Sequence, residues 1–274
     1  MAFMFNQAGE MDYEVRATGI LSTQPIDDGV DVPFGTVVHP GVLAAHHQHI
    51  FSLRVDPAID GYHNRLVYDE AHAMPRSDFN PHGTGYHVQE NIVSESGGYN
   101  LDFDANRTFK IQNVDVRNPV NGKPVAYKIH APPFQKMLLD SESFNHKRAE
   151  FADKNIYAVK YRDGELYAGG LYTNQSRGGT GVRSWADRKD NIVDEDLVVF
   201  VQFGMNHVPR IEDFPGKNEP ALPFLEPSLT RDAVMPVEII KVAFKPVNFF
   251  DKNPALDVPP SKLTIPSNPL RTTQ

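Results

Sequence analysis

Cysteine is absent from the 274 residues of the sequence. This absence excludes a disulfide framework, a thiolate metal site and a cysteine nucleophile. An excess of positive charge is also missing, because 27 lysines and arginines face 35 aspartates and glutamates, for a formal net charge of −8. Binding to nucleic acid needs a basic face, so no nucleic-acid partner is expected.

Signals for a membrane or a particular compartment are also missing from the sequence. No apolar run is long enough to span a bilayer, so no membrane association is expected. The N-terminal residues lack the basic region of a signal peptide, and the C-terminal residues 271–274 carry no peroxisomal or retention signal. The sequence therefore leaves the localisation unknown.

Short segments rich in Val, Ile, Phe and Tyr dominate the chain, and its 22 prolines and 19 glycines supply the breaks between them. Such segments favour strands. The predicted strands are residues 13–21, 36–54, 88–93, 108–114, 126–130, 156–161, 197–203 and 237–244. A helix is predicted over 143–154, a proline-rich loop over 216–233, and an extended tail from residue 253. No shift in composition marks a boundary, so residues 1–274 are expected to form a single all-β domain.

The motif with the clearest chemistry is His46-His47-Gln48-His49. Alternate side chains of a strand point to opposite faces, so His47 and His49 would share one face and His46 and Gln48 the other. Two imidazoles on one face can chelate a divalent metal, and His207, at the end of a later strand, is the candidate third ligand. Imidazole suits Zn, Cu, Fe and Ni, and a chain with 11 histidines also contains such spacings by chance.

A cupin motif competes for the same histidines. Cupins carry a glycine, five residues, His-x-His, a glutamate and a glycine, and four of these places are matched by Gly41, His47, His49 and Gly61. The place of the glutamate, however, holds Leu53 or Arg54. A cupin-like metal enzyme is therefore the less favoured interpretation.

Longer strings around the histidines resemble the copper amine oxidases. In that family a strand ending in Thr-Gly-Ile-Leu-Ser/Thr precedes His-Gln-His-Phe/Leu-Phe-Ser-x-Arg-hydrophobic-Asp and then Asp-Gly. The matching segments are residues 14–23, 47–56 and 60–61, followed by 172–175, 196–215, 234–236 and 249–260. These ordered motifs cover nearly the whole chain. The sequence is thereby similar to the C-terminal catalytic domain of a copper-containing primary-amine oxidase.

The resemblance implies that His47, His49 and His207 are three copper ligands. Their other ring nitrogens are then expected to bond to carbonyls or carboxylates, which fixes the tautomer. The resemblance also implies a large, mostly antiparallel β-sandwich with β-hairpin arms that forms a homodimer. Met235 resembles a methionine near the copper in some relatives, with core packing as the alternative.

The resemblance further implies a second metal, calcium or manganese, near an Asp-x-Asp pair and an aspartate before the third histidine. Asp56 and Asp196 match two of these acids. Ala58 stands where the pair has its second aspartate, and losing a carboxylate weakens a site for a hard cation. Ordinary strand-end carboxylates are therefore the alternative for this pair.

The implied activity is oxidative deamination of a primary amine by dioxygen, giving aldehyde, ammonia and hydrogen peroxide, with copper and topaquinone as cofactors. In the family the quinone-forming tyrosine lies upstream of a Phe-x-Gln-Asp-Gly segment, which residues 5–9 match. The tyrosine and the aspartate base would thus precede Met1, and Tyr13 lies on the wrong side of the segment. We expect an N-terminally truncated domain that supplies the copper site, contains no catalytic residue and is inactive alone. A non-enzymatic copper- or zinc-binding β module is the alternative.

Overall fold

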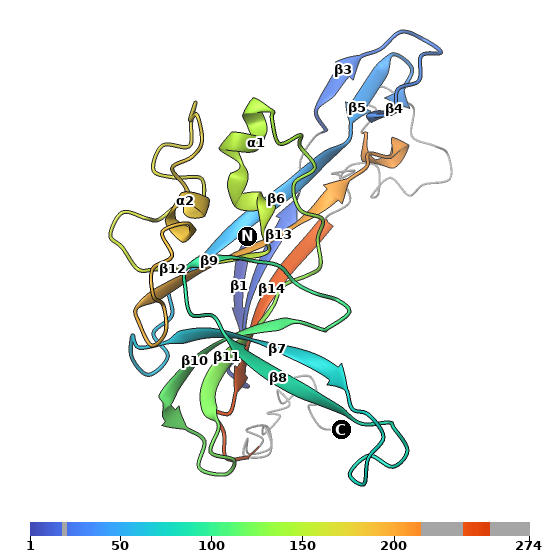
Figure 1. The fold of residues 1–274 in the computed structure, drawn as a ribbon. Helices are drawn as coiled ribbons and strands as arrows, with labels where there is room; N and C mark the ends of the chain where they lie inside the picture. Colours follow the sequence, from blue (N-terminus) through green and yellow to red (C-terminus); the bar gives the residue numbers. More distant parts are fainter. Residues whose placement is uncertain (18–20, 215–237, 253–274) are drawn as a thin grey trace, which may run out of the picture.

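The computed structural model describes residues 1–17, 21–214 and 238–252, and its regular structure is mainly β-strand (Figure 1). The strands are β1 Ala2–Phe5, β2 Met11–Ala17, β3 Thr23–Pro25, β4 Gly35–His39, β5 Val42–Ala45, β6 His47–Val55, β7 Arg65–Ala73, β8 Tyr86–Ile92, β9 Gly97–Tyr99, β10 Thr108–Arg117, β11 Pro124–His130, β12 Ile156–Lys160, β13 Leu197–His207 and β14 Glu238–Val247. Two short helices, α1 Phe144–Arg148 and α2 Val182–Ala186, accompany the 3-10 turns η1 Glu150–Asp153 and η2 Ile211–Asp213.

The strands form three sheets in which neighbouring strands run antiparallel. A seven-stranded sheet has the order β1-β2-β14-β11-β10-β7-β8, a four-stranded sheet the order β6-β13-β12-β9, and a small sheet the order β3-β5-β4. The two larger sheets pack against each other around one core, which combines Leu66, Phe109 and Ile111 with Val199 and Phe203. The expected all-β, mostly antiparallel sandwich is confirmed.

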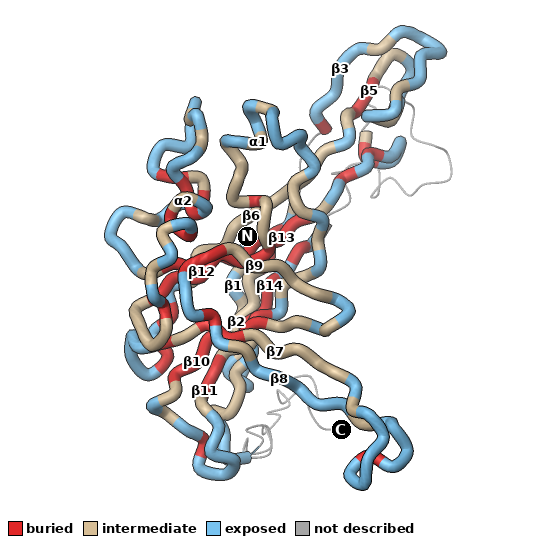
Figure 2. Tube along the Cα trace, in the orientation of Figure 1, coloured by how far each residue is buried: buried red, intermediate tan, exposed pale blue. Residues whose placement is uncertain are grey.

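Strand β13 lies at the centre of this packing. Val199, Val201 and Phe203 point into the core between the sheets, and the alternate residues Val198 and Phe200 pack beneath α2. Both faces of β13 are therefore buried, which explains its uninterrupted hydrophobic run. Figure 2 shows the buried residues concentrated along β12 and β13 and the exposed ones in the hairpins and loops.

The predicted strand over 36–54 is wrong, because three strands occupy that stretch. The chain reverses between β4 and β5 at Gly41, whose φ of +73° favours glycine, and it breaks again at His46 before β6 begins. Strands β1, β3, β7 and β9 were not predicted. Strand β7 was missed because polar residues near its end interrupt the alternation of apolar and polar residues. That end of the strand extends beyond the core in the β7–β8 hairpin (Figures 1 and 2).

The predicted helix over 143–154 is present in two shorter pieces. Ser143 caps α1, because its Oγ accepts a hydrogen bond from the His146 backbone N–H at 3.1 Å. At Ala149 the helix ends and η1 continues the turn. The loop predicted over 216–233, the tail from residue 253 and Met235 lie outside the described residues.

Two hairpins extend from the body of the molecule, the β4–β5 hairpin at one end and the β7–β8 hairpin at the other (Figure 1). They match the expected arms, while association into a homodimer stays a prediction. Within the residues that the structure describes, no helix has both the length and the apolar character needed to cross a membrane.

Candidate metal centre

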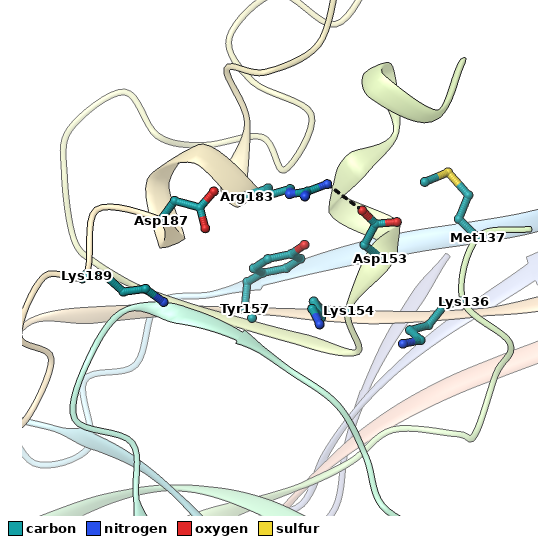
Figure 3. Close-up of a pocket in the computed structure, with 9 residues that line it drawn as sticks. Lys136, Met137, Asp153, Lys154, Tyr157, Arg183, Asp187 and Lys189 are labelled. Atoms are coloured by element: carbon teal, nitrogen blue, oxygen red, sulfur yellow. Dashed lines mark hydrogen bonds and ion pairs between the residues drawn. The ribbon is translucent and has the colours of Figure 1, made fainter. Parts of the chain in front are cut away.

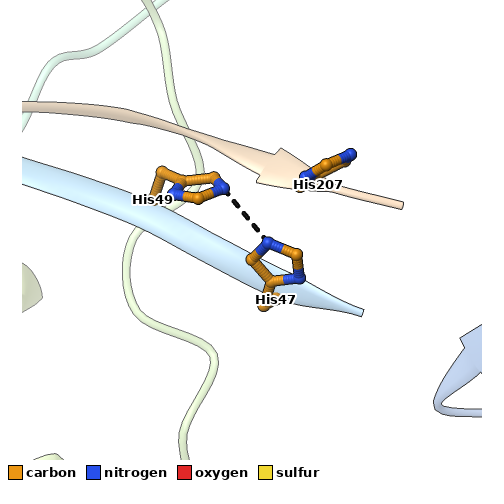
Figure 4. Close-up of side chains that lie close together, drawn as sticks. All are labelled: His47, His49 and His207. Atoms are coloured by element: carbon orange, nitrogen blue, oxygen red, sulfur yellow. Dashed lines mark hydrogen bonds between the residues drawn. The ribbon is translucent and has the colours of Figure 1, made fainter. Parts of the chain in front are cut away.

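The antiparallel pairing of β6 with β13 brings the three predicted ligand histidines together. His47, the first residue of β6, lies opposite His207, the last residue of β13, and His49 lies opposite Met205. His47 and His49 point to the same side, as the two-residue period of a strand requires (Figure 4). The cupin-like alternative does not require His207 in this group, whereas the copper interpretation does.

The three imidazoles form a compact group of nitrogen donors. The Nε2 atoms of His47 and His49 are 3.1 Å apart, and one nitrogen from each of the three rings lies within 4.8 Å of the others. Metal–nitrogen bonds to imidazole are about 2 Å long, so one ion between the rings can reach all three nitrogens. In the part of the chain that the structure describes, no other group of three His, Cys, Asp or Glu residues meets this geometry.

The remaining hydrogen bonds of the rings indicate which nitrogens face the metal. Nδ1 of His47 is 2.9 Å from the carbonyl oxygen of Ala45, which leaves Nε2 directed at His49. Nε2 of His207 is 3.3 Å from Oδ2 of Asp213, while its Nδ1 is buried and has no hydrogen-bond partner among the residues that the structure describes. A buried polar atom without a partner is unfavourable, and a metal ion would satisfy it. The residues present therefore fit a copper ion.

Several known proteins with a similar sequence are named as copper enzymes. Residues 1–264 match the family model described as copper amine oxidase, enzyme domain. The chain belongs to the copper amine oxidase family. This assignment confirms the resemblance seen in the sequence, and the family uses copper and topaquinone.

Relatives of this copper amine oxidase chain are similar over most of its length. Copper amine oxidase 1 of Aspergillus niger is 42% identical over 263 residues, which cover 95% of this chain and 36% of the relative. Histamine oxidase of Arthrobacter globiformis is 32% identical over 255 residues, covering 92% of this chain and 34% of the relative. The crystal structure of a copper-containing benzylamine oxidase from Hansenula polymorpha superimposes with a TM-score of 0.85 at 45% identity, covering 94% of this chain and 38% of that one. The chain thus spans little more than a third of the length of these relatives.

Asp213 is a functional candidate that the sequence reasoning missed. It lies in η2, is 3% exposed, and also accepts hydrogen bonds from the backbone and the side chain of Arg210. Burial alone would raise the pKa of Asp213, but the hydrogen bonds from Arg210 and His207 outweigh burial and lower it. The aspartate is thereby ionised beside His207 and orients the ring. An acid six residues after a ligand histidine was the available signal.

Replacing Asp213 by asparagine is expected to weaken copper binding by about 10- to 100-fold, the usual effect of losing the outer partner of a ligand. The amide keeps the size of the side chain but removes the charge that holds the His207 ring in place. Copper affinity measured by competition with a chelator tests this expectation. Asp187→Asn, which changes a carboxylate outside the metal centre, is the control. Equal copper affinities for the two variants would contradict the role of Asp213 in orienting His207.

Gln48 lies between His47 and His49 in the sequence, and Asn206 precedes His207. Their side chains are bonded to each other and help to hold β6 and β13 in register. Gln48 Nε2 donates to Oδ1 of Asn206 at 2.7 Å, and its Oε1 accepts from the backbone N–H of Leu138 at 2.8 Å. Asn206 in turn donates to Oε1 of Gln135 at 3.0 Å. A slip of β6 against β13 would break these bonds, so they help to keep His47 opposite His207.

The two acids of the predicted second metal site lie near each other. Asp56 pairs with Arg54 through an Nη1–Oδ2 contact of 2.9 Å, and Oδ1 of Asp196 is buried without a hydrogen-bond partner. Burial, followed by the charge of Asp56, raises the pKa of Asp196. A cation there would relieve both effects, but Arg54 already supplies a positive charge, and the second-metal interpretation stays a prediction.

Two of the cavities in the described part of the chain lie beside the four-stranded sheet. A cavity of about 580 Å³ adjoins the metal centre, where His47 and His207 line it together with the apolar Ile50, Leu138 and Phe151. A more polar cavity of about 510 Å³ is lined by Tyr157, by several lysines and by Arg183, which pairs with Asp153 at 2.9 Å (Figure 3). None of the three ligand histidines lines the polar cavity, whereas the apolar one gives small molecules a place beside the metal.

Proposed function

We propose that this chain forms the copper-binding part of an enzyme that oxidises primary amines to aldehydes with dioxygen, releasing ammonia and hydrogen peroxide. The observation that carries the proposal is the unpartnered, buried Nδ1 of His207 next to the converging rings of His47 and His49. Family membership over residues 1–264 supports the reaction class. The substrate amine is left open, since the relatives' names refer to different amines.

The residues in and around the metal centre have separate tasks in this proposal. His47, His49 and His207 hold the copper, which when bound supplies the redox chemistry that the family uses with its quinone. Asp213 and the Ala45 carbonyl fix the ring orientations, and the Gln48–Asn206 pair fixes the strand register. Tyr13 packs edge-on against Phe203 in the core, 6.0 Å between ring centroids, which supports a structural role for it.

The quinone and the base are proposed to lie outside these 274 residues, because the sequence contains no Asn-Tyr-Asp/Glu motif. The chain would then bind copper without turning over amines by itself. A protein that combines these residues with the quinone-bearing segment would carry the activity. The non-enzymatic copper- or zinc-binding module is the second candidate, favoured by the same three histidines.

Elemental analysis of the purified chain after copper loading and extensive dialysis tests the metal proposal. We expect the three-histidine centre to retain close to one copper per chain, the copper that is lost in His207→Ala, with Cu(II) electron paramagnetic resonance showing nitrogen ligands. Calcium or manganese retained in the same sample, and lost in Asp196→Asn, would support the second site. A folded chain that retains no copper would contradict the proposal, and a preference for zinc over copper would favour the non-enzymatic module.

A further inference from the structure

A second pair of histidines faces each other in the β7–β8 hairpin, which belongs to the seven-stranded sheet and not to the sheet of the copper centre. His72 and His87 are direct partners in the antiparallel register, so their side chains leave the sheet on the same face. Their ring centroids are 5.6 Å apart at an interplanar angle of 36°. In the copper centre the ring pairs are separated by 4.8, 4.8 and 5.8 Å. The hairpin pair thus has the spacing of rings that can share an ion.

A carboxylate lies beside this pair. Glu70 precedes His72 by two residues on β7 and shares its face, and its Oε2 is 3.8 Å from Nε2 of His72. The other oxygen of Glu70 accepts a hydrogen bond from Nε of Arg107 at 2.7 Å, and the Arg107 guanidinium also lies over the Tyr68 ring. Arg107 therefore holds one oxygen of Glu70, and Oε2 is the oxygen near His72.

The loop of the hairpin is ordered without the ion. Asn80, which is 5% exposed, donates to the carbonyl oxygen of Met74 and accepts from the backbone N–H groups of Thr84 and Gly85. These bonds order the loop that joins the two strands. The backbone positions of His72 and His87 are therefore set by strand pairing before an ion binds, which lowers the entropy lost on binding.

The pair is also accessible. The His72 side chain is 41% exposed and His87 is exposed as well, so an ion can enter from solvent and keep water ligands. Two imidazole nitrogens are a donor pair for first-row transition metals, whereas calcium and magnesium prefer oxygen ligands. Among the divalent ions Cu(II) forms the strongest bonds to such a pair.

We propose that His72 and His87 together bind a divalent transition-metal ion, Cu(II) most tightly, with the carboxylate of Glu70 adding negative charge beside them, and thereby tie the two strands of the hairpin together. This second ion has a structural role and does not depend on the proposed amine oxidation. It adds a binding site to the chain that is separate in sequence and in space from the histidines of β6 and β13.

Equilibrium dialysis against buffered free Cu(II), followed by elemental analysis, tests the hairpin site in the intact 274-residue chain. We expect two copper ions per chain in the wild type, one in His87→Gln, one in His207→Ala and none in the double variant. The affinity of the hairpin ion should fall by more than about tenfold in His87→Gln, since even outer partners of a ligand contribute that much. His72→Gln should behave like His87→Gln, and far-UV circular dichroism checks that each variant is folded.

The matched control is His82→Gln, an exposed histidine in the loop of the same hairpin. It should retain both ions. Copper binding by His87→Gln and His72→Gln that equals the wild type would overturn the hairpin site, as would a wild-type chain that binds a single copper lost in His207→Ala. Loss in the hairpin variants with no change in His207→Ala would support the hairpin site and contradict the copper centre instead.

Discussion

Replacing His207 by alanine is expected to abolish copper retention by the centre on β6 and β13. His207 is the ligand contributed by the second strand, and its buried Nδ1 has no partner other than the proposed metal. Without it, His47 and His49 offer two nitrogens from a single strand. We expect the copper affinity to fall by more than about a hundredfold, above the effect of losing an outer partner.

The same variant should also lose the stabilisation that copper gives to the fold. A ligand that binds only the folded state stabilises it by mass action, by about 4 kcal/mol at a thousandfold excess over its dissociation constant. Thermal unfolding followed with and without copper measures this difference. The wild type should melt at a higher temperature with copper, whereas His207→Ala should show a clearly smaller increase, because only the proposed hairpin ion remains.

His46→Ala is the control for this experiment. His46 is adjacent to the ligands in sequence but exposed, and its Nε2 lies 3.5 Å from the Thr36 hydroxyl instead of the metal centre. Its copper content and copper-dependent melting should match the wild type. If His207→Ala retained the same copper at the same affinity, or if His46→Ala lost it, the assignment of the centre to these three rings would be wrong.

The second large effect is expected from Gly204→Ala, a change of one methyl group inside β13. A Cβ at Gly204 would lie 2.2 Å from the backbone oxygen of His49 and 3.0 Å from Cα of Ile50. These neighbours are backbone atoms of β6, so no side chain can rotate away to make room. The two strands would have to separate at the point where His49 is held.

We therefore expect Gly204→Ala to reduce both stability and copper binding. Overpacking a tight site typically destabilises a protein by about 1–3 kcal/mol. Here the added Cβ would meet backbone atoms, which cannot move aside as a flexible side chain can. Denaturant unfolding of the copper-free chain gives the free energy of unfolding, and chelator competition gives the copper affinity. Both should fall, because the strand separation moves His49 relative to His207.

Ser52→Ala provides the comparison on the opposite strand. Its hydroxyl donates to Oε1 of Gln202 across the β6–β13 pair at 3.2 Å, so the change removes a contact between the strands without adding volume. It should reduce stability by about 1 kcal/mol and leave copper binding unchanged. A Gly204→Ala protein with the copper affinity of Ser52→Ala would show that β6 and β13 can adjust without disturbing the centre.

Local patterns predicted the parts of this protein that depend on neighbouring residues. The two-residue period of a strand placed His47 and His49 on one face, and the long apolar run at 197–203 identified the strand that becomes β13. The same approach failed at 36–54, because a β-rich composition does not distinguish one long strand from two strands around a turn at Gly41. It also missed Asp213, since the six-residue spacing from His207 does not by itself show that η2 folds back onto that ring.

The sequence by itself determined the all-β class, the pair of same-face imidazoles and the family motifs, because each is written in short stretches or in ordered strings of residues. Only the tertiary structure decided which nitrogens converge. His207 meets His47 across 160 positions because β6 pairs with β13, and Glu70, His72 and His87 gather because β7 pairs with β8. Strand pairing sets such contacts through hydrogen bonds and side-chain packing between distant segments, which no local pattern contains.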